Sequence, residues 1–173
     1  MRNKFRITVL SDNRILKKTL ESEHGLSVLL DTGEFKVLLD TGASGQFIQN
    51  AERLGIDIKD IDYVFISHGH ADHIGGLIPF LEINSKAKIL LSENALNQRF
   101  FSIRNGYRNI GIDAELGKYK ERCVFIERET HIDGDIDIFP CYSISFIKPI
   151  ANGTLFKDSG NGLELDDFSH AFA

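Results

Sequence analysis

The chain has 173 residues, 42% of them hydrophobic and 26% charged, with a formal net charge of −5 at pH 7. This length can bury a substantial core as a single domain over residues 1–173, and the mixed, slightly acidic charges exclude a basic surface for nucleic acid. No apolar run approaches a membrane span and Ile7–Leu10 is too short for the core of a secretion signal, so we expect a cytoplasmic protein with no membrane partner.

The first half of the chain predicts a hairpin followed by alternating helices and strands. A turn at 31–34 separates two apolar runs, and Gly33 can adopt the positive φ that a tight turn needs. Apolar residues at helical spacing stop at Gly55, a natural end for a helix. β-branched and aromatic residues indicate buried strands. We therefore expect strands at 5–10, 27–30, 35–39, 61–66 and 88–91, and helices at 47–54, 74–84 and 92–98.

The second half is less regular. The segment 100–119 shows no clear hydrophobic periodicity. The arginines Arg99, Arg104 and Arg108 can bind a phosphate or carboxylate group, or can form a solvated face. Short apolar runs predict strands at 123–126, 136–139 and 143–147. We expect a loop from 153 to 167, a mobile His170 near the chain end, and buried free thiols at Cys123 and Cys141.

The most specific pattern follows the strand predicted at 61–66. Three of the six histidines, His68, His70 and His73, stand within six positions together with Asp72. Neutral imidazole and carboxylate are ligands that zinc takes, at about 2.0 to 2.2 Å. In extended backbone His68 and His70 point to the same side and can hold one metal, while Asp72, the expected N-cap of the next helix, and His73 face a second position. The alternative is a surface loop, or core histidines that each bind a backbone carbonyl.

The His-x-His-x-Asp-His pattern after a hydrophobic strand resembles the metallo-β-lactamase superfamily of metal-dependent hydrolases. Residues 23–27, 37–42, 50–56 and 166–168 further resemble the subgroup related to dihydropterin ribofuranosylaminobenzene phosphate synthase. The resemblance implies an α/β fold, the αββα sandwich, of which this chain would contain the first half and part of the second. A missing half would leave apolar surface uncovered, so we expect a homo-oligomer, a dimer or larger.

The resemblance also implies roles for individual residues. His68 and His70 would bind one metal, Asp72 and His73 the other, and Asp40 would support the site by a hydrogen bond to a ligand histidine. We expect one or two zinc ions, with manganese and iron as alternatives. Asp72 would also be the catalytic residue, orienting the attacking water on a small-molecule, phosphate-containing substrate. The family adds a later histidine, an aspartate and a final histidine, which we expect to lie beyond the end of this chain.

Two functional hypotheses follow. The first is a metal-dependent hydrolase in which metal-activated water attacks a phosphoester-type or related substrate. The second is a truncated, catalytically incompetent relative that keeps the fold with a partial or empty metal site.

Several other residues have weaker patterns. Asp31 and Asp40 both stand in Leu-Asp-Thr-Gly, which is typical of aspartic proteases, but a helix follows the second copy and the later glycine pattern of those proteases is absent. His24 either contacts substrate, braces the site or is structural. His131 is expected at a strand edge rather than as a ligand.

Overall fold

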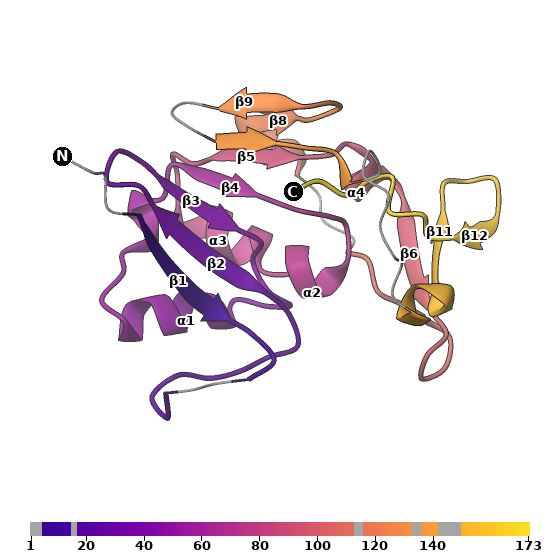
Figure 1. Cartoon of the computed structure of the whole chain (residues 1–173), viewed down its shortest axis with the longest axis horizontal. Helices are drawn as coiled ribbons and strands as arrows, with labels where there is room; N and C mark the ends of the chain where they lie inside the picture. Colours follow the sequence, from indigo (N-terminus) through magenta and orange to yellow (C-terminus); the bar gives the residue numbers. More distant parts are fainter. Residues whose placement is uncertain (1–4, 15–16, 113–115, 133–135, 142–149) are drawn as a thin grey trace.

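The computed structural model describes residues 5–14, 17–112, 116–132, 136–141 and 150–173. Its centre is a six-stranded sheet in the order β1–β2–β3–β4–β5–β8 (Figure 1). The pairs β1–β2 and β2–β3 are antiparallel, whereas β3, β4, β5 and β8 run parallel. The six strands are β1 (Arg6–Ser11), β2 (Ser27–Asp31), β3 (Lys36–Leu39), β4 (Tyr63–Phe65), β5 (Lys88–Leu91) and β8 (Cys123–Phe125).

Helices cover one face of this sheet. Leu38, Val64 and Ile89 lie on that face because alternate residues of a strand point to opposite sides, and all three are fully buried. They pack with Phe47 of α1 and Phe80 of α3, whose ring centroids are 6.4 Å apart. The α-helices are α1 (Gln46–Arg53), α2 (Ala71–Ile74), α3 (Leu77–Ile83) and α4 (Asn94–Asn97), and short 3-10 helices span Ile58–Asp60, Gly117–Arg122 and Ile150–Thr154. Within the described ranges, no helix is both long and apolar enough to cross a membrane.

A short hairpin and the last residues of the chain cover part of the opposite face. Strand β9 (Thr130–Ile132) pairs antiparallel with β10 (Ile136–Ile138). Phe65 of β4 and Phe172 belong to a second core cluster with residues of this hairpin. The N–H of Phe172 also donates to the carbonyl of Ser67 at 2.9 Å, which fixes the last residues beside the end of β4.

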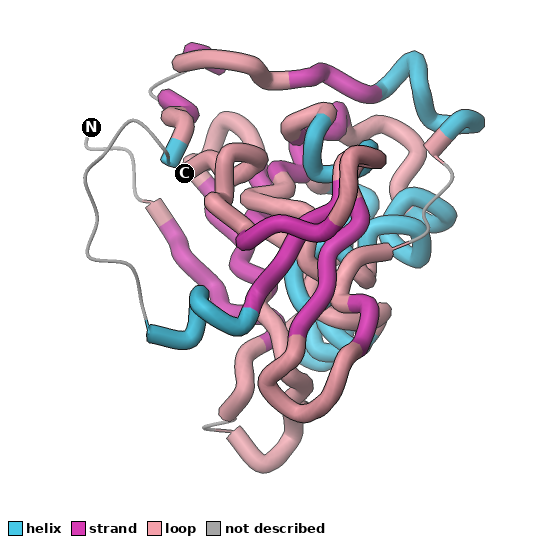
Figure 2. Tube along the Cα trace, turned by 90° about the vertical axis from the view of Figure 1, so that its right-hand side faces the viewer, coloured by secondary structure: helices cyan, strands magenta, loops and turns pink. Residues whose placement is uncertain are grey.

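A second, four-stranded antiparallel sheet stands beside the main one, in the order β12–β11–β6–β7. Figure 2, in which the right-hand side of Figure 1 faces the viewer, shows its strands in front of the main body. Phe100 of β6 is fully buried and its ring centroid lies 5.2 Å from that of His70 and 4.4 Å from that of His170, so this sheet packs against the loop that follows β4. Its strands are β6 (Arg99–Ser102), β7 (Arg108–Asn109), β11 (Leu155–Asp158) and β12 (Leu163–Leu165).

The structure confirms the expected mixed α/β architecture, and it corrects some segments. Gly33 has the positive φ expected for the hairpin turn, and β5 spans the predicted residues. The loop expected at 153–167 was wrong, because it contains β11 and β12, and the segment expected to be irregular contains most of β6 and all of β7. These strands are short, so they give little periodicity in the sequence. Cys123 and Cys141 are free but only half-buried, and the strand expected at 143–147 lies outside the described residues.

The single helix expected at 74–84 is two helices. The carbonyl of His73 accepts the N–H of Thr41 at 2.7 Å and the Thr41 hydroxyl at 3.0 Å, so it is satisfied outside the helix. At Gly76 an added methyl group would overlap the carbonyl oxygens of Thr41 and Ser44. Close approach of two backbones therefore ends α2 at Ile74 and requires glycine before α3.

Candidate metal centre

The candidate site lies where parallel strands of the main sheet end together. Strands β3 and β4 run parallel; Asp40 follows the first, and the segment 67–70 follows the second. Open α/β sheets place their binding sites at such carboxyl ends. Helix α2 then carries Asp72 and His73. The expected N-cap was wrong: His70 occupies that position and no side chain caps the helix, so Asp72 lies in the first turn.

Asp40 contacts several groups of the site at once. Its side chain is buried and its φ is 55°, in the left-handed region that aspartate tolerates better than most residues. Oδ1 accepts the N–H of Ser67 at 2.8 Å, and Oδ2 lies 2.7 Å from both the Ser67 hydroxyl and Nδ1 of His73. An ionised carboxylate can only accept hydrogen bonds, so all three partners must donate.

This requirement fixes the tautomers of two histidines. Because Nδ1 of His73 carries a proton, Nε2 of the neutral ring keeps its lone pair. The single hydroxyl proton of Ser67 goes to Asp40, so Ser67 Oγ must accept from Nδ1 of His68, 2.8 Å away. His68 therefore also presents a lone pair on Nε2. One buried aspartate thus sets two imidazoles, whose ring centroids are 4.1 Å apart, in the form that binds a metal.

Burial and neighbouring charges act on these groups in opposite directions. Burial, followed by the charges of His73 and His70, holds the pKa of His68 well below its ordinary value, which keeps that ring neutral. Burial alone would lower the pKa of His73 too, but its hydrogen bond with Asp40 and the charges of Asp40 and Asp72 raise it. Asp72 Oδ2 lies 3.7 Å from Nε2 of His73 and 3.5 Å from Nε2 of His24. Asp72 and His73 therefore lie close together, and their role at a second metal position stays a prediction.

A second group consists of His70, Asp166 and His170, all buried. Nε2 of His70 lies 2.8 Å from Oδ2 of Asp166, and Nε2 of His170 lies 3.1 and 3.3 Å from Oδ1 and Oδ2. Two ligands of one zinc ion are no more than about 4.4 Å apart at ordinary bond lengths. Burial alone would raise the pKa of Asp166, but hydrogen bonds from His170 and His70 hold it well below its ordinary value, so it is ionised. This group has the size and donor types of a metal site.

His170 has another contact that distinguishes it from His70. The N–H of Gly69 donates to Nδ1 of His170 at 3.2 Å, so that nitrogen accepts, and Nε2 carries the proton that is donated to Asp166. In the described part of the chain, Nδ1 of His70 has no such partner. His170 in this arrangement positions the carboxylate of Asp166, whereas His70 can turn a lone pair toward a metal.

No ligand role was predicted from the sequence for Asp166 or His170. The expectation that His170 is mobile was wrong, since its side chain is fully buried. An aspartate and a histidine four residues apart, followed by the apolar pair Ala171 and Phe172, was the available signal of a buried polar contact. His131 does lie at a strand edge, on β9. Its Nδ1 is 2.7 Å from Oδ1 of Asp137, and its side chain is exposed.

The two aspartates of the repeated Leu-Asp-Thr-Gly pattern do not form a protease pair. Asp31 stands at the turn end of the hairpin, opposite Lys36, and accepts the N–H of Gly33. Asp40 follows the other end of β3. A shared proton requires two carboxylates in contact, so the aspartic-protease interpretation fails on geometry.

A cavity of about 410 Å³ opens beside the histidine cluster. His24, His70 and Asp72 line it from the main body, and residues of the four-stranded sheet line it from the other side. The side chain of Asp72 is 29% exposed, so solvent and small molecules reach its carboxylate. His24 is exposed at the cavity wall, with Nε2 3.5 Å from Oδ2 of Asp72 and Nδ1 3.1 Å from Oδ1 of Asn13.

Comparisons with known proteins show a similarity to one family. The family described as the metallo-beta-lactamase superfamily matches residues 22–140. The crystal structure of Tm1679, described as a metal-dependent hydrolase of the beta-lactamase superfamily, is 33% identical and aligns with a TM-score of 0.75 over 98% of this chain and 60% of its own.

Two curated proteins of Methanocaldococcus jannaschii are also similar. The uncharacterized protein MJ0448 is 32% identical over 165 residues, which cover 90% of this chain and 62% of that protein. The enzyme named 7,8-dihydropterin-6-methyl-4-(beta-D-ribofuranosyl)-aminobenzene-5'-phosphate synthase is 34% identical over 85 residues, 46% of this chain and 29% of the enzyme. The chain spans about 60% of the length of Tm1679 and MJ0448.

Proposed function

The chain belongs to the metallo-β-lactamase superfamily, and on this basis we propose that it is a metal-dependent hydrolase whose metal site is the histidine and aspartate cluster at the ends of β3 and β4. The observation that carries the proposal is the contact of His70 with Asp166, 96 residues later in the chain, in a buried group of three side chains with donor atoms close enough for a metal ion. One fold can host many functions, so the proposed activity is inferred from the residues of the site rather than from the fold.

We assign His68, His70, Asp72, His73 and Asp166 as the ligands of one or two ions. Zinc is the metal we expect, and manganese and iron are alternatives that suit imidazole and carboxylate donors. When bound, such an ion supplies Lewis acidity that polarises the scissile group and lowers the pKa of water toward neutrality.

The residues of the chain then have separate tasks. Asp40 holds His73 directly, and His68 through Ser67, in the tautomer that leaves the lone pair on Nε2. Asp72 faces the cavity, where its carboxylate can orient the attacking water and accept its proton. His24 contacts that carboxylate and limits its movement.

The substrate we propose is a small molecule with a phosphoester-type or related bond. Support comes from the name of the similar dihydropterin enzyme, which makes a phosphate-containing product, and from the arginines of the cavity wall. Guanidinium groups bind phosphate oxygens in pairs of parallel hydrogen bonds.

Metal analysis of the purified chain combined with a phosphodiesterase assay tests the proposal. We expect stoichiometric metal and turnover of bis(p-nitrophenyl) phosphate, with both lost in His70→Ala. His131→Ala is the matched control, because that histidine also contacts an aspartate but lies on the exposed β9–β10 hairpin. A chain that binds no metal and shows no turnover would support the alternative, a relative that keeps the fold without catalysis.

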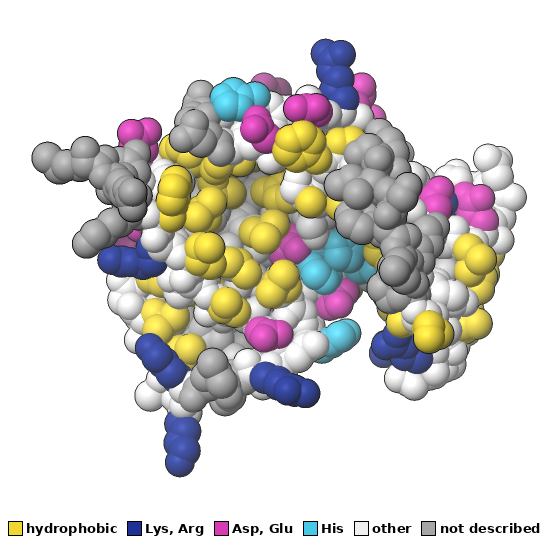
Figure 3. Space-filling model, viewed as in Figure 1, with side chains coloured by type: hydrophobic (Ala, Val, Ile, Leu, Met, Phe, Trp, Pro, Cys, Tyr) yellow, Lys and Arg dark blue, Asp and Glu magenta, His cyan; other side chains and the backbone are white. Residues whose placement is uncertain are grey.

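We also propose self-association through the uncovered part of the sheet. Ile7 and Val9 of β1 are 71% and 50% exposed, and they stand opposite Leu30 and Val28 of β2. Figure 3 shows hydrophobic side chains gathered over this side of the main sheet. Burying such a surface against a second copy would stabilise a homo-oligomer. Light scattering that gives the mass of a monomer at micromolar concentration would contradict this expectation.

A further inference from the structure

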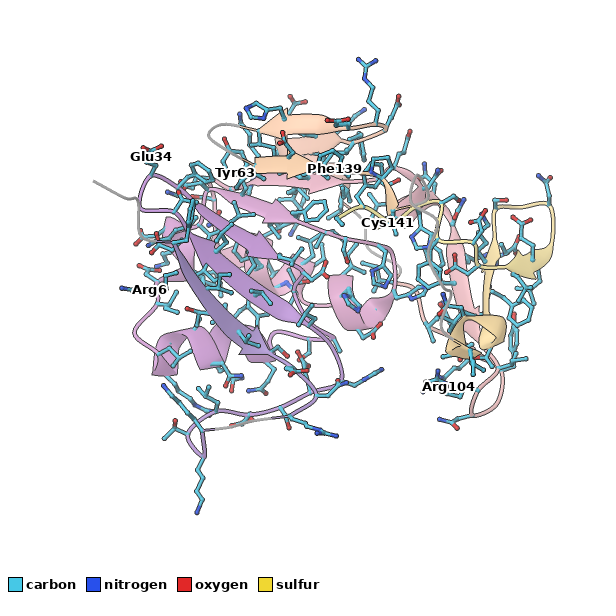
Figure 4. All side chains as sticks on the ribbon, viewed as in Figure 1. Arg6, Glu34, Tyr63, Arg104, Phe139 and Cys141 are labelled. Carbon is cyan, nitrogen blue, oxygen red and sulfur yellow. The ribbon has the colours of Figure 1, made fainter. Side chains whose placement is uncertain are left out.

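The cavity beside the histidine cluster has two chemically different walls. His70 and Asp72 lie on the wall formed by the main body, and Arg104 and Arg108 lie on the wall formed by the four-stranded sheet. Figure 3 shows the hollow between these two parts, with histidine on one side and a basic side chain on the other. Figure 4 labels Arg104 on the four-stranded-sheet side of this hollow.

Strand register explains why Arg108 faces the cavity. Arg108 of β7 pairs with Ser102 of β6, which pairs with Leu155 of β11. Residues directly opposite one another in antiparallel strands share a face, and all three line the cavity. The fully buried Phe100 lies two residues before Ser102 and so points the same way, toward His70 and His170.

The three arginines of this segment separate into two kinds. Arg99 lies one residue before Phe100, on the other face of β6, and its guanidinium forms an ion pair with Asp158 at 2.6 Å. For Arg104 and Arg108, no carboxylate of the described residues is within ion-pair distance. Two guanidinium groups that form no ion pair with a carboxylate of the described residues therefore border the cavity that His70 and Asp72 also line.

We propose that Arg104 and Arg108 form an oxyanion clamp that holds a phosphate or carboxylate group of the substrate in this cavity. The proposal rests on the proposed hydrolase for the identity of the bound molecule as substrate. Two guanidinium forks supply paired donors that match either oxyanion, and Asn109, on the same wall, adds an amide. The anionic group is thereby held on the wall opposite Asp72 and His70, which leaves the rest of the substrate directed toward the metal ligands.

Isothermal titration calorimetry of the full chain with inorganic phosphate and, separately, with acetate tests the clamp. We expect binding of at least one anion, weakened about tenfold by Arg104→Gln or Arg108→Gln and more by the double variant. Arg99→Gln is the matched control, since it removes a guanidinium group from the same four-stranded sheet on the face away from the cavity, and it should leave the affinity unchanged. The anion that binds identifies whether the clamp takes phosphate or carboxylate.

Titrations with metal-free and metal-loaded protein separate this proposal from the proposed function. Arginine-dependent anion binding in the metal-free chain supports the clamp even where no metal binds and no turnover is seen. Conversely, metal binding and turnover with equal anion affinity in the wild type and the double variant would overturn the clamp and leave the hydrolase intact. Failure of the wild type to bind either anion at millimolar concentration would also overturn it. Unchanged metal content and melting temperature in the double variant establish that the change is local.

Discussion

Replacement of Asp40 by asparagine tests whether one buried carboxylate sets the metal-binding form of two histidines. The amide keeps an oxygen that can accept the N–H of Ser67, but it places an NH₂ donor where Oδ2 stood, 2.7 Å from the Ser67 hydroxyl and from Nδ1 of His73. Ser67 can rotate its hydroxyl, whereas His73 must turn a lone pair of Nδ1 to the amide. The ring proton then moves to Nε2 and blocks the nitrogen that would bind the metal.

The size of the effect follows from the interactions that change. Loss of a partner that orients a ligand histidine typically weakens metal affinity about 10- to 100-fold, which equals about 1.4 to 2.7 kcal/mol. In the metal-free chain the same change removes charge-assisted hydrogen bonds from a buried carboxylate and should cost about 2 kcal/mol of folding free energy. For a chain of this length that corresponds to a fall in melting temperature of about 4 to 8 °C.

Zinc affinity measured by competition with a chromophoric chelator, together with a thermal melt of the metal-free chain, provides the assay. Asp31→Asn is the matched control: it changes the other copy of the Asp-Thr-Gly sequence on the same hairpin, where, among the described residues, the carboxylate accepts only the N–H of Gly33, a bond that the amide oxygen preserves. If Asp40→Asn binds zinc within twofold of Asp31→Asn, the tautomer argument is refuted.

Three further predictions concern other parts of the site and the fold. Asp166→Asn should remove metal binding more completely than His170→Gln, because the aspartate is a ligand and the histidine positions it; equal losses by metal analysis would contradict that division. Gly76→Ala should lower the free energy of unfolding by about 3 kcal/mol because its methyl group meets two backbone carbonyls, whereas Gly117→Ala, which meets nothing, should not; urea titration compares them. Burial alone would raise the pKa of Asp62, but hydrogen bonds from Lys86 and the Lys36 N–H outweigh it and hold the pKa below its usual value. The ionised carboxylate therefore contributes fully to folding stability above about pH 4, and this contribution is lost as the pH falls through the lowered pKa. Asp62→Asn should therefore destabilise the chain by no more than about 1 kcal/mol at pH 7, and by less as the pH falls through the lowered pKa; a loss that stays equal as the pH is lowered in denaturant titrations would show that charge is not the cause.

Local sequence was enough to locate the first part of the site. His68, His70, Asp72 and His73 lie within six positions, after a strand and at the start of a helix, so their proximity follows from the local geometry of those two elements. The family resemblance predicted Asp40 as a hydrogen-bond support for a ligand histidine, and the structure places its Oδ2 2.7 Å from Nδ1 of His73, after a strand parallel and adjacent to β4. The ligand roles themselves stay proposals until metal binding is measured.

The sequence by itself determined the fold class, the strand-to-helix ligand loop and the residue types that suit a metal. Only the tertiary structure brings Asp166 and His170 to that loop. It also shows that Arg104 and Arg108 line the cavity whereas Arg99 pairs with Asp158 on the other face. The physical reason is distance along the chain: contacts across 96 residues depend on the pairing of β11 with β6, on the packing of Phe100 against His170 and on the docking of the last residues beside β4. Periodicity in a short stretch of sequence carries no information on such long-range pairing, because each of these contacts becomes favourable only when the others have already formed.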